Sequence, residues 1–177
     1  MTAERVDVRN GIDWGEFEEA LGVVGAEAKN ARAPKASRVR WLGGLKLKVG
    51  VRNHTFLVDE PSHLTGEDEA PNAVEYVLGA YGACLATGLI INASRRKIEL
   101  RNLELSLEST QENAFSFMGI NDEGHSGIDE VKVKLYVQAD ADEAALREVW
   151  EHTLRTSPVG NTLINQVKVT PELSVIA

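Results

Sequence analysis

The feature that most limits the fold of this chain is a long apolar segment near its middle. Residues 74–91 are mostly apolar, and glycine and alanine are concentrated at the centre of the segment. Asn72 can cap a helix that starts here, Glu75 falls in the first turn, and the basic residues 95–97 suit the other end of the helix dipole. The pattern predicts a helix over about 72–95, roughly 35 Å long at about 1.5 Å per residue.

This helix is expected to lie in the core of the domain. Each internal glycine costs about 1 kcal/mol relative to alanine, so a run of small residues indicates that a neighbouring backbone packs closely against it. A membrane span is a poor interpretation, because Glu75 and several glycines interrupt the segment and residues 94–97 (Ser-Arg-Arg-Lys) follow it directly. We therefore expect no membrane partner.

An arm precedes the main domain. Asp13 is a plausible cap for a first helix that fades by about Asn30, and residues 30–36 read as a linker. Its apolar positions recur at spacings of three and four: Trp14, Phe17, Leu21 and Val24. We expect an N-terminal helical arm over 1–33 and a single domain over 34–177.

The rest of the chain alternates with the period of strands. Before the long helix, the strands are expected at 38–41, 45–51 and 55–58, with a hairpin at Gly43-Gly44 and a surface loop at 59–71. After it, they are expected at 99–110, 114–120 (weaker), 131–138 and at Val167, Val169 and 173–176, with a turn at 122–124 and a second helix at 142–156 that Ser157-Pro158 ends. Hairpins dominate, so we predict an α+β fold with mainly antiparallel sheet.

Composition excludes several classes of protein. The net charge of -8 argues against binding to nucleic acid, and one cysteine excludes an intrachain disulfide, which favours a reducing cytoplasm. The spacing of the four histidines suggests no metal site, and no glycine-rich phosphate loop stands out, so we expect no cofactor.

Three stretches of the chain carry motifs whose order and spacing belong together. They are Arg40-Trp41-Leu42-Gly43-Gly44-Leu45 with Val58-Asp59-Glu60-Pro61; Pro71-Asn72-Ala73-Val74-Glu75 with Gly79-Ala80-Tyr81-Gly82-Ala83-Cys84-Leu85-Ala86; and Ser157-Pro158-Val159-Gly160-Asn161-Thr162-Leu163. From about Ser37 onward the chain resembles the OsmC/Ohr family of hydroperoxide-reducing thiol proteins. The resemblance implies an OsmC-like fold with two long core helices and an intertwined homodimer whose site lies at the subunit interface; the N-terminal helix is extra.

The resemblance assigns roles to particular residues, with two departures. The peroxidatic position falls on Cys84, but the resolving cysteine of the family is replaced by Ser157, which cannot form a disulfide. The family arginine that pairs with the thiolate has no counterpart in the corresponding region, about 58–66, and Arg40 and Arg52 lie earlier in the chain. The family carboxylate near the start of the helix matches Glu75.

Each assigned residue also has a simpler interpretation. Cys84 could be a small buried core residue, and Glu75 a favourable first-turn acid, which lies on the opposite helix face from Cys84. Tyr81 or Thr87 could donate a hydrogen bond to the sulfur. Ser157 could merely end a helix before proline, or its hydroxyl could reach Cys84 across the dimer interface.

Two functions remain open from the sequence. The first is a stress-related protein that reduces organic hydroperoxides through the catalytic residues Cys84 and Glu75, with Tyr81, Thr87 and Ser157 at the pocket and an external thiol as reductant. The alternative is a non-catalytic dimeric module that binds a small hydrophobic ligand. A purely structural role has only the extra arm helix in its favour, and that arm could cover or narrow the pocket.

Overall fold

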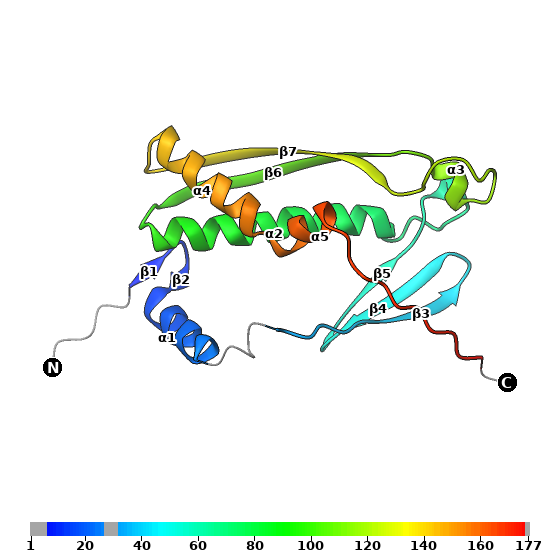
Figure 1. Ribbon diagram of the computed structural model, residues 1–177, viewed down its shortest axis with the longest axis horizontal. Coiled ribbons are helices and arrows are strands. Elements are labelled where there is room, and N and C mark those ends of the chain that lie inside the picture. The colour runs from blue at the N-terminus through cyan, green and yellow to red at the C-terminus, as the bar shows by residue number, and fades with distance from the viewer. Residues whose placement is uncertain (1–6, 27–31, 176–177) are drawn as a thin grey trace.

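The computed structural model describes residues 7–26 and 32–175, and shows an α+β fold arranged around one central helix, α2 (Figure 1). The hairpin β6–β7 lies along one side of α2, and α4 and α5 also pack against this helix. The elements are β1 (Val8–Arg9), β2 (Ile12–Asp13), α1 (Trp14–Gly25), β3 (Arg38–Gly43), β4 (Lys46–Val51), β5 (His54–Val58), η2 (Ser62–Leu64), α2 (Ala73–Arg95), β6 (Leu100–Gln111), α3 (Ala114–Phe117), β7 (Ile128–Ala139), α4 (Glu143–Thr156) and α5 (Pro158–Ile164).

The predicted central helix is confirmed, and its first turn shows why it starts where it does. The Asn72 side chain accepts a hydrogen bond from the Glu75 backbone N–H at 3.0 Å, and the Glu75 carboxylate accepts one from the Asn72 N–H at 2.8 Å. This capping box satisfies two amide groups that the helix itself leaves without partners. The small residues do permit close approach, although side chains rather than a backbone fill the space: a Cβ on Gly82 would lie 2.8 Å from Leu107, and one on Gly88 3.1 Å from Thr153.

The hydrophobic core lies at the C-terminal half of α2. Its buried members are Leu89, Ala93, Ile98 and Val149, and partly buried residues of β6, β7 and α4 surround them. The second predicted helix corresponds to α4, and its apolar face packs against α2 as its amphipathic pattern predicts. Trp150 belongs to this core.

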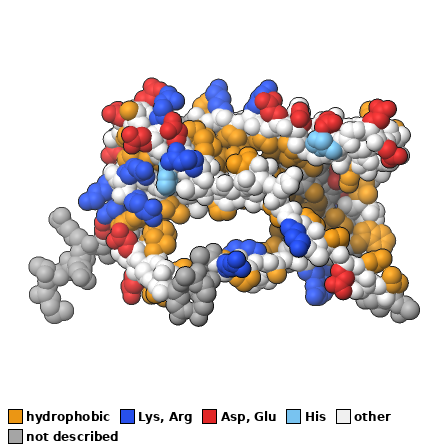
Figure 2. Space-filling model, in the orientation of Figure 1, with side chains coloured by type: hydrophobic (Ala, Val, Ile, Leu, Met, Phe, Trp, Pro, Cys, Tyr) orange, Lys and Arg blue, Asp and Glu red, His pale blue; other side chains and the backbone are white. Residues whose placement is uncertain are grey.

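The three-stranded antiparallel sheet β3–β4–β5 lies on the other side of α2 from β6–β7 (Figure 1). Gly43 and Gly44 make the predicted hairpin turn, with φ values of 126° and 53° that glycine adopts without strain. Figure 2 shows an open space through the molecule between the arm, the central helix and this sheet. In the single chain many large apolar side chains are exposed, among them Val39, Trp41 and Phe117.

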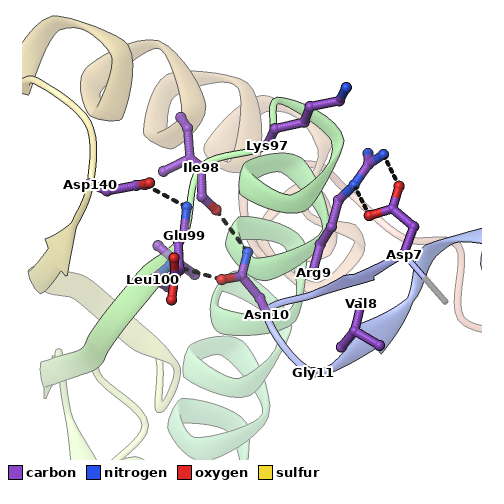
Figure 3. Close-up of a pocket in the computed structure, with 10 residues that line it drawn as sticks. All are labelled: Asp7, Val8, Arg9, Asn10, Gly11, Lys97, Ile98, Glu99, Leu100 and Asp140. Atoms are coloured by element: carbon purple, nitrogen blue, oxygen red, sulfur yellow. Dashed lines mark hydrogen bonds and ion pairs between the residues drawn. The ribbon is translucent and has the colours of Figure 1, made fainter. Parts of the chain in front are cut away.

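A hairpin that the sequence analysis did not predict joins the arm to the end of α2 (Figure 3). Asn10 and Gly11, with φ values of 49° and 79°, form its turn. The Asn10 side-chain amide donates to the Ser94 hydroxyl and to the Ile98 carbonyl, each at 2.9 Å, and its oxygen accepts the Leu100 N–H at 2.7 Å. One asparagine thus pairs polar groups where the helix ends and β6 begins, which fixes the arm to the domain.

The hairpin also sets the start of α1. Asp13 caps this helix as predicted, and Trp14 is only 3% exposed, with the Arg9 guanidinium 5.0 Å above its ring. Arg9 pairs in turn with Asp7 and donates to the Ser94 carbonyl at 3.3 Å. An open hollow of about 670 Å³ lies beside these residues. The predicted fading of the helix near Asn30 lies outside the described residues.

Two predicted strands are wrong. Residues 114–120 contain the short helix α3, because the Asn113 side chain caps it by accepting the Phe115 N–H at 3.0 Å. Residues 165–175 form no strand, since within the described residues no neighbouring strand pairs with them; Ile176 lies outside that part. The helix α5 was not predicted, because Ser157-Pro158 both ends α4 and begins a new helix.

By length and composition, α2 could cross a membrane, and it is the one such helix among the described residues. Such a helix is weak support for a span, because the central helix of a folded domain has the same composition. Within one chain α2 packs against β6, α4 and α5, and 11% of its 18-residue apolar window is buried.

Candidate functional site

The structure brings Cys84 and Ser157 together within one chain. Cys84 is half-buried in the middle of α2, and its Sγ lies 3.3 Å from the Oγ of Ser157. Ser157 is 4% exposed and connects α4 to α5. The contact expected across a subunit interface is thus formed without a second subunit.

The other hydrogen bond of Ser157 determines what its hydroxyl can offer the sulfur. The Ser157 Oγ accepts the backbone N–H of Gly160 at 3.0 Å, which caps the start of α5. Its single hydroxyl proton remains available for Cys84. When the sulfur is a thiolate it can only accept, so the serine then acts as donor and stabilises the negative charge.

Tyr81 and Thr87 differ in their positions relative to this pair. Tyr81 is half-buried, and its ring lies so close to Gly160 that a Cβ there would meet it at 3.1 Å. Thr87 is exposed. Among the residues that the structure describes, Ser157 is the one side chain that hydrogen-bonds Cys84.

Glu75 lies elsewhere on α2. Nine residues separate it from Cys84, which is about 13 Å along the helix axis. Its carboxylate is held in the capping box with Asn72. Within one chain, Glu75 therefore stabilises the start of the helix rather than facing the sulfur.

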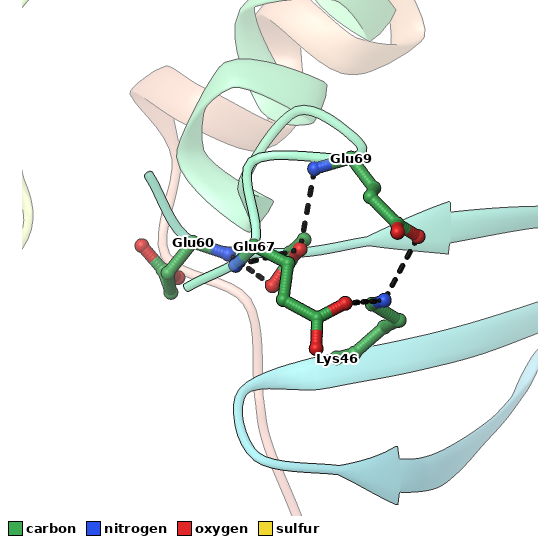
Figure 4. Close-up of polar contacts among 5 residues, drawn as sticks. Lys46, Glu60, Glu67 and Glu69 are labelled. Carbon is green, nitrogen blue, oxygen red and sulfur yellow. Dashed lines mark hydrogen bonds and ion pairs between the residues drawn. The ribbon is translucent and has the colours of Figure 1, made fainter. Parts of the chain in front are cut away.

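The loop 59–69 before α2 contains the buried carboxylate of Asp59, which belongs to one of the family motifs but was given no role from the sequence. Asp59 is 1% exposed and accepts backbone N–H groups from Glu60 at 2.9 Å, Glu67 at 3.2 Å and Glu69 at 3.3 Å. Lys46 of β4 pairs with the side chains of Glu67 and Glu69, which ties the loop to the sheet (Figure 4). A single acid in a glycine-containing loop gives no sequence signal of this role, because the role depends on how the loop closes.

The loop should loosen in acid. Burial alone would raise the pKa of Asp59, but the three backbone donors, assisted by the charge of Lys46, outweigh it and hold the pKa below the ordinary 3.8. A lowered pKa means that the stabilisation is present above pH 3.8 and is lost as the pH falls through the folded value. We expect the melting temperature of the wild type to fall more steeply below about pH 4 than that of Asp59→Asn. If the melting temperatures of the wild type and Asp59→Asn fall in parallel as the pH is lowered, Asp59 is not the cause of the loss of stability in acid.

Two hollows have mainly apolar linings. A groove of about 580 Å³ runs along the small-residue face of the helix, between Gly79, Gly82 and the leucines of β6. A second hollow of about 350 Å³ lies between the β3–β4 hairpin, Leu64, Phe117 and Met118. No group of three histidine, cysteine or acidic residues within the described ranges could hold a metal ion.

Comparison with solved structures relates this fold to known proteins. An OsmC-like protein from Mycoplasma pneumoniae superposes with a TM-score of 0.63 at 14% identity, over 74% of this chain and 87% of the other. An organic hydroperoxide resistance protein OsmC from Legionella pneumophila gives a TM-score of 0.54 at 16% identity, covering 75% and 90%. One from Elizabethkingia anophelis gives 0.53 at 17%, covering 75% and 89%. These likenesses establish the fold.

Sequence comparison supplies the family. No curated protein matches the chain in sequence. The family model for OsmC-like proteins matches residues 66–172, which include α2 with Cys84, both strands of the β6–β7 hairpin and the α4–α5 junction with Ser157. The match spans more than half of the 177 residues. The chain therefore belongs to the OsmC-like protein family.

Proposed function

We propose that this protein reduces organic hydroperoxides through Cys84, acting as a homodimer in the cytoplasm with an external thiol as reductant. The observation that carries the proposal is the contact between Cys84 and Ser157, which gives the sulfur a buried hydroxyl donor at 3.3 Å. Family membership supports it, since relatives with this fold are described as organic hydroperoxide resistance proteins. The free cysteine is in keeping with a reducing compartment.

The chemistry follows from a single sulfur. The Cys84 thiolate attacks one oxygen of the peroxide; an S–O bond forms as the O–O bond breaks, and the leaving alkoxide takes a proton from water to become an alcohol. Ser157 cannot attack the resulting sulfenic acid to form a disulfide. An external thiol therefore displaces water to give a mixed disulfide, and a second thiol releases reduced Cys84 together with an external disulfide.

Uncovered apolar surface supports the homodimer. The groove along α2 is lined by leucines of β6, and the C-terminal residues Val167, Val169 and Leu173 are 60%, 78% and 87% exposed. A second copy placed against α2 would bury such surface at about 25 cal/mol per Å². A catalytic role for Glu75 would then have to be exerted on the partner's site, because Glu75 and Cys84 of one chain lie far apart along α2.

Intact-mass measurement after treatment with tert-butyl hydroperoxide tests the function. The wild type should gain one oxygen atom on Cys84, then a mixed disulfide once thiol is added, whereas Cys84→Ser should stay unmodified. Ser157→Ala should react about tenfold more slowly, because it lacks one hydrogen bond to the charged sulfur. A wild-type Cys84 that remains a free thiol while glutathione in the same solution is oxidised would refute the proposal.

A specific observation also favours the alternative function, a module that binds a small hydrophobic ligand. The hollow of about 350 Å³ is lined mainly by apolar side chains, among them Leu45, Leu47 and Met118. Two results together would support this module. The wild type and Cys84→Ser should bind an apolar fluorescent probe equally well, and Cys84 of the wild type should not react with hydroperoxide. Loss of probe binding in Leu47→Asp, with retained binding in Val167→Asp, would place the ligand in this hollow.

A further inference from the structure

Three cations gather on one face of the β3–β4–β5 sheet. Arg38, Arg40 and Lys48 line a hollow of about 290 Å³ together with Gly50 and Thr55. The strand register places them on the same face, because Arg38 pairs with Gly50 and Arg40 with Lys48 directly across β3 and β4. Gly50 leaves the floor of the hollow free of a side chain.

This face points away from the central helix. Side chains alternate across a strand, and the neighbouring position, Val49, is buried on the other face. Phe56, which pairs with Val49, packs against Tyr76 of α2 with ring centroids 4.8 Å apart and the rings tilted by 40°. The three cations are therefore on the outer face, and the two arginines among them are not placed to serve Cys84 in the same chain.

In the described part of the chain these three cations have no acidic partner, as is true of most of its other basic side chains. Among the described residues, ion pairs tie down Lys46, Arg9, Arg147 and Lys132, whereas none involves Arg38, Arg40 or Lys48. Arg40 and Lys48 instead face each other directly, an arrangement that destabilises a sheet when the charges are alike.

We propose that this hollow binds a small phosphate-type polyanion. Two guanidinium groups offer planar pairs of donors that match oxyanions, the ammonium of Lys48 adds a point charge, and the Thr55 hydroxyl can donate from the third strand. An anion bound over Gly50 would neutralise the positive charges of Arg40 and Lys48, which face each other across β3 and β4. The site is independent of the chemistry of Cys84.

Titration with inorganic pyrophosphate by calorimetry, at constant ionic strength, tests the site. Arg40→Gln should weaken binding at least about tenfold, because it removes charge-assisted hydrogen bonds. Gly50→Val keeps every charge, suits a strand and fills the floor, so it should weaken binding to a similar extent. Arg52→Gln removes the same charge from the β4–β5 turn of the same sheet, outside the hollow, and should bind as the wild type does.

Three results would overturn the proposal. They are the absence of pyrophosphate binding, equal weakening by Arg52→Gln and Arg40→Gln, and undiminished binding by Gly50→Val. If a single-stranded oligonucleotide binds more tightly than pyrophosphate and Arg40→Gln abolishes that binding, the ligand is nucleic acid and the proposal of a small anion is wrong. Wild-type levels of hydroperoxide reduction in Arg40→Gln would show that the two sites act separately.

Discussion

Replacing Ser157 with cysteine should allow a disulfide to form with Cys84 inside one chain. The two side chains already touch, with 3.3 Å between Sγ and Oγ, and 73 positions separate them in sequence. Closing a loop of that length restricts the unfolded chain by about 4 kcal/mol in the chain-entropy description. Because Ser157 also caps α5, its loss costs about 1 kcal/mol, so we expect a net gain of about 3 kcal/mol in the oxidised variant.

Mass spectrometry and denaturant unfolding would measure this result. After treatment with hydroperoxide, Ser157→Cys should lose two hydrogen atoms, resist alkylation and unfold at higher denaturant concentration than its reduced form. Thr87→Cys is the matched control, since its Cβ lies about 5–6 Å from that of Cys84 one helical turn away, too far for good disulfide geometry. Cross-links found only between chains would contradict the contact within one chain.

Gly66→Ala should destabilise the loop before α2 by about 3 kcal/mol. A Cβ at Gly66 would lie 1.7 Å from the carbonyl oxygen of Glu60 and 2.3 Å from its carbon, and both are backbone atoms. The loop could accommodate alanine only by opening, which would pull the N–H groups away from Asp59 and break the pairing of Lys46. Unlike a flexible side chain, a backbone carbonyl cannot simply turn aside.

Urea unfolding would measure the effect, and Gly22→Ala provides its counterpart. Nothing lies within 4 Å of a Cβ placed at Gly22 in α1, so alanine there should raise stability by up to about 1 kcal/mol through helix propensity. Both substitutions replace glycine with alanine, but Gly66→Ala should lower the free energy of unfolding and Gly22→Ala should raise it. Equal unfolding midpoints for Gly66→Ala and the wild type would show that the loop does not close as described.

The parts of the fold that the sequence predicted are those that local chemistry decides. The capping residues of α2, the glycine turn between β3 and β4 and the apolar face of α4 are all readable from neighbouring positions. Pairing over longer distances was not readable. Phe115 and Phe117 alternate like strand residues, yet Asn113 caps a short helix there, and within residues 7–26 and 32–175 no strand pairs with them.

The candidate site was predicted in the same partial way. The resemblance to the family placed Cys84 and Ser157 in one pocket, and the structure places them in contact. The capping role of Glu75 was readable from its position in the first turn. The role of Asp59 was not readable from the sequence. Its carboxylate accepts the backbone N–H groups of residues 60, 67 and 69, and these come together only after the loop has closed.

The short hairpin at Asn10 and Gly11 has a consequence for the order in which the molecule folds. Asn-Gly is a strong turn signal, so the turn itself can form early. Its hydrogen bonds to Ser94, Ile98 and Leu100 span 84, 88 and 90 positions of the chain. Contacts of such high sequence separation must wait for loop closure and for the end of the central helix to exist. The arm therefore precedes the central helix in the chain but is among the last segments to reach its final place.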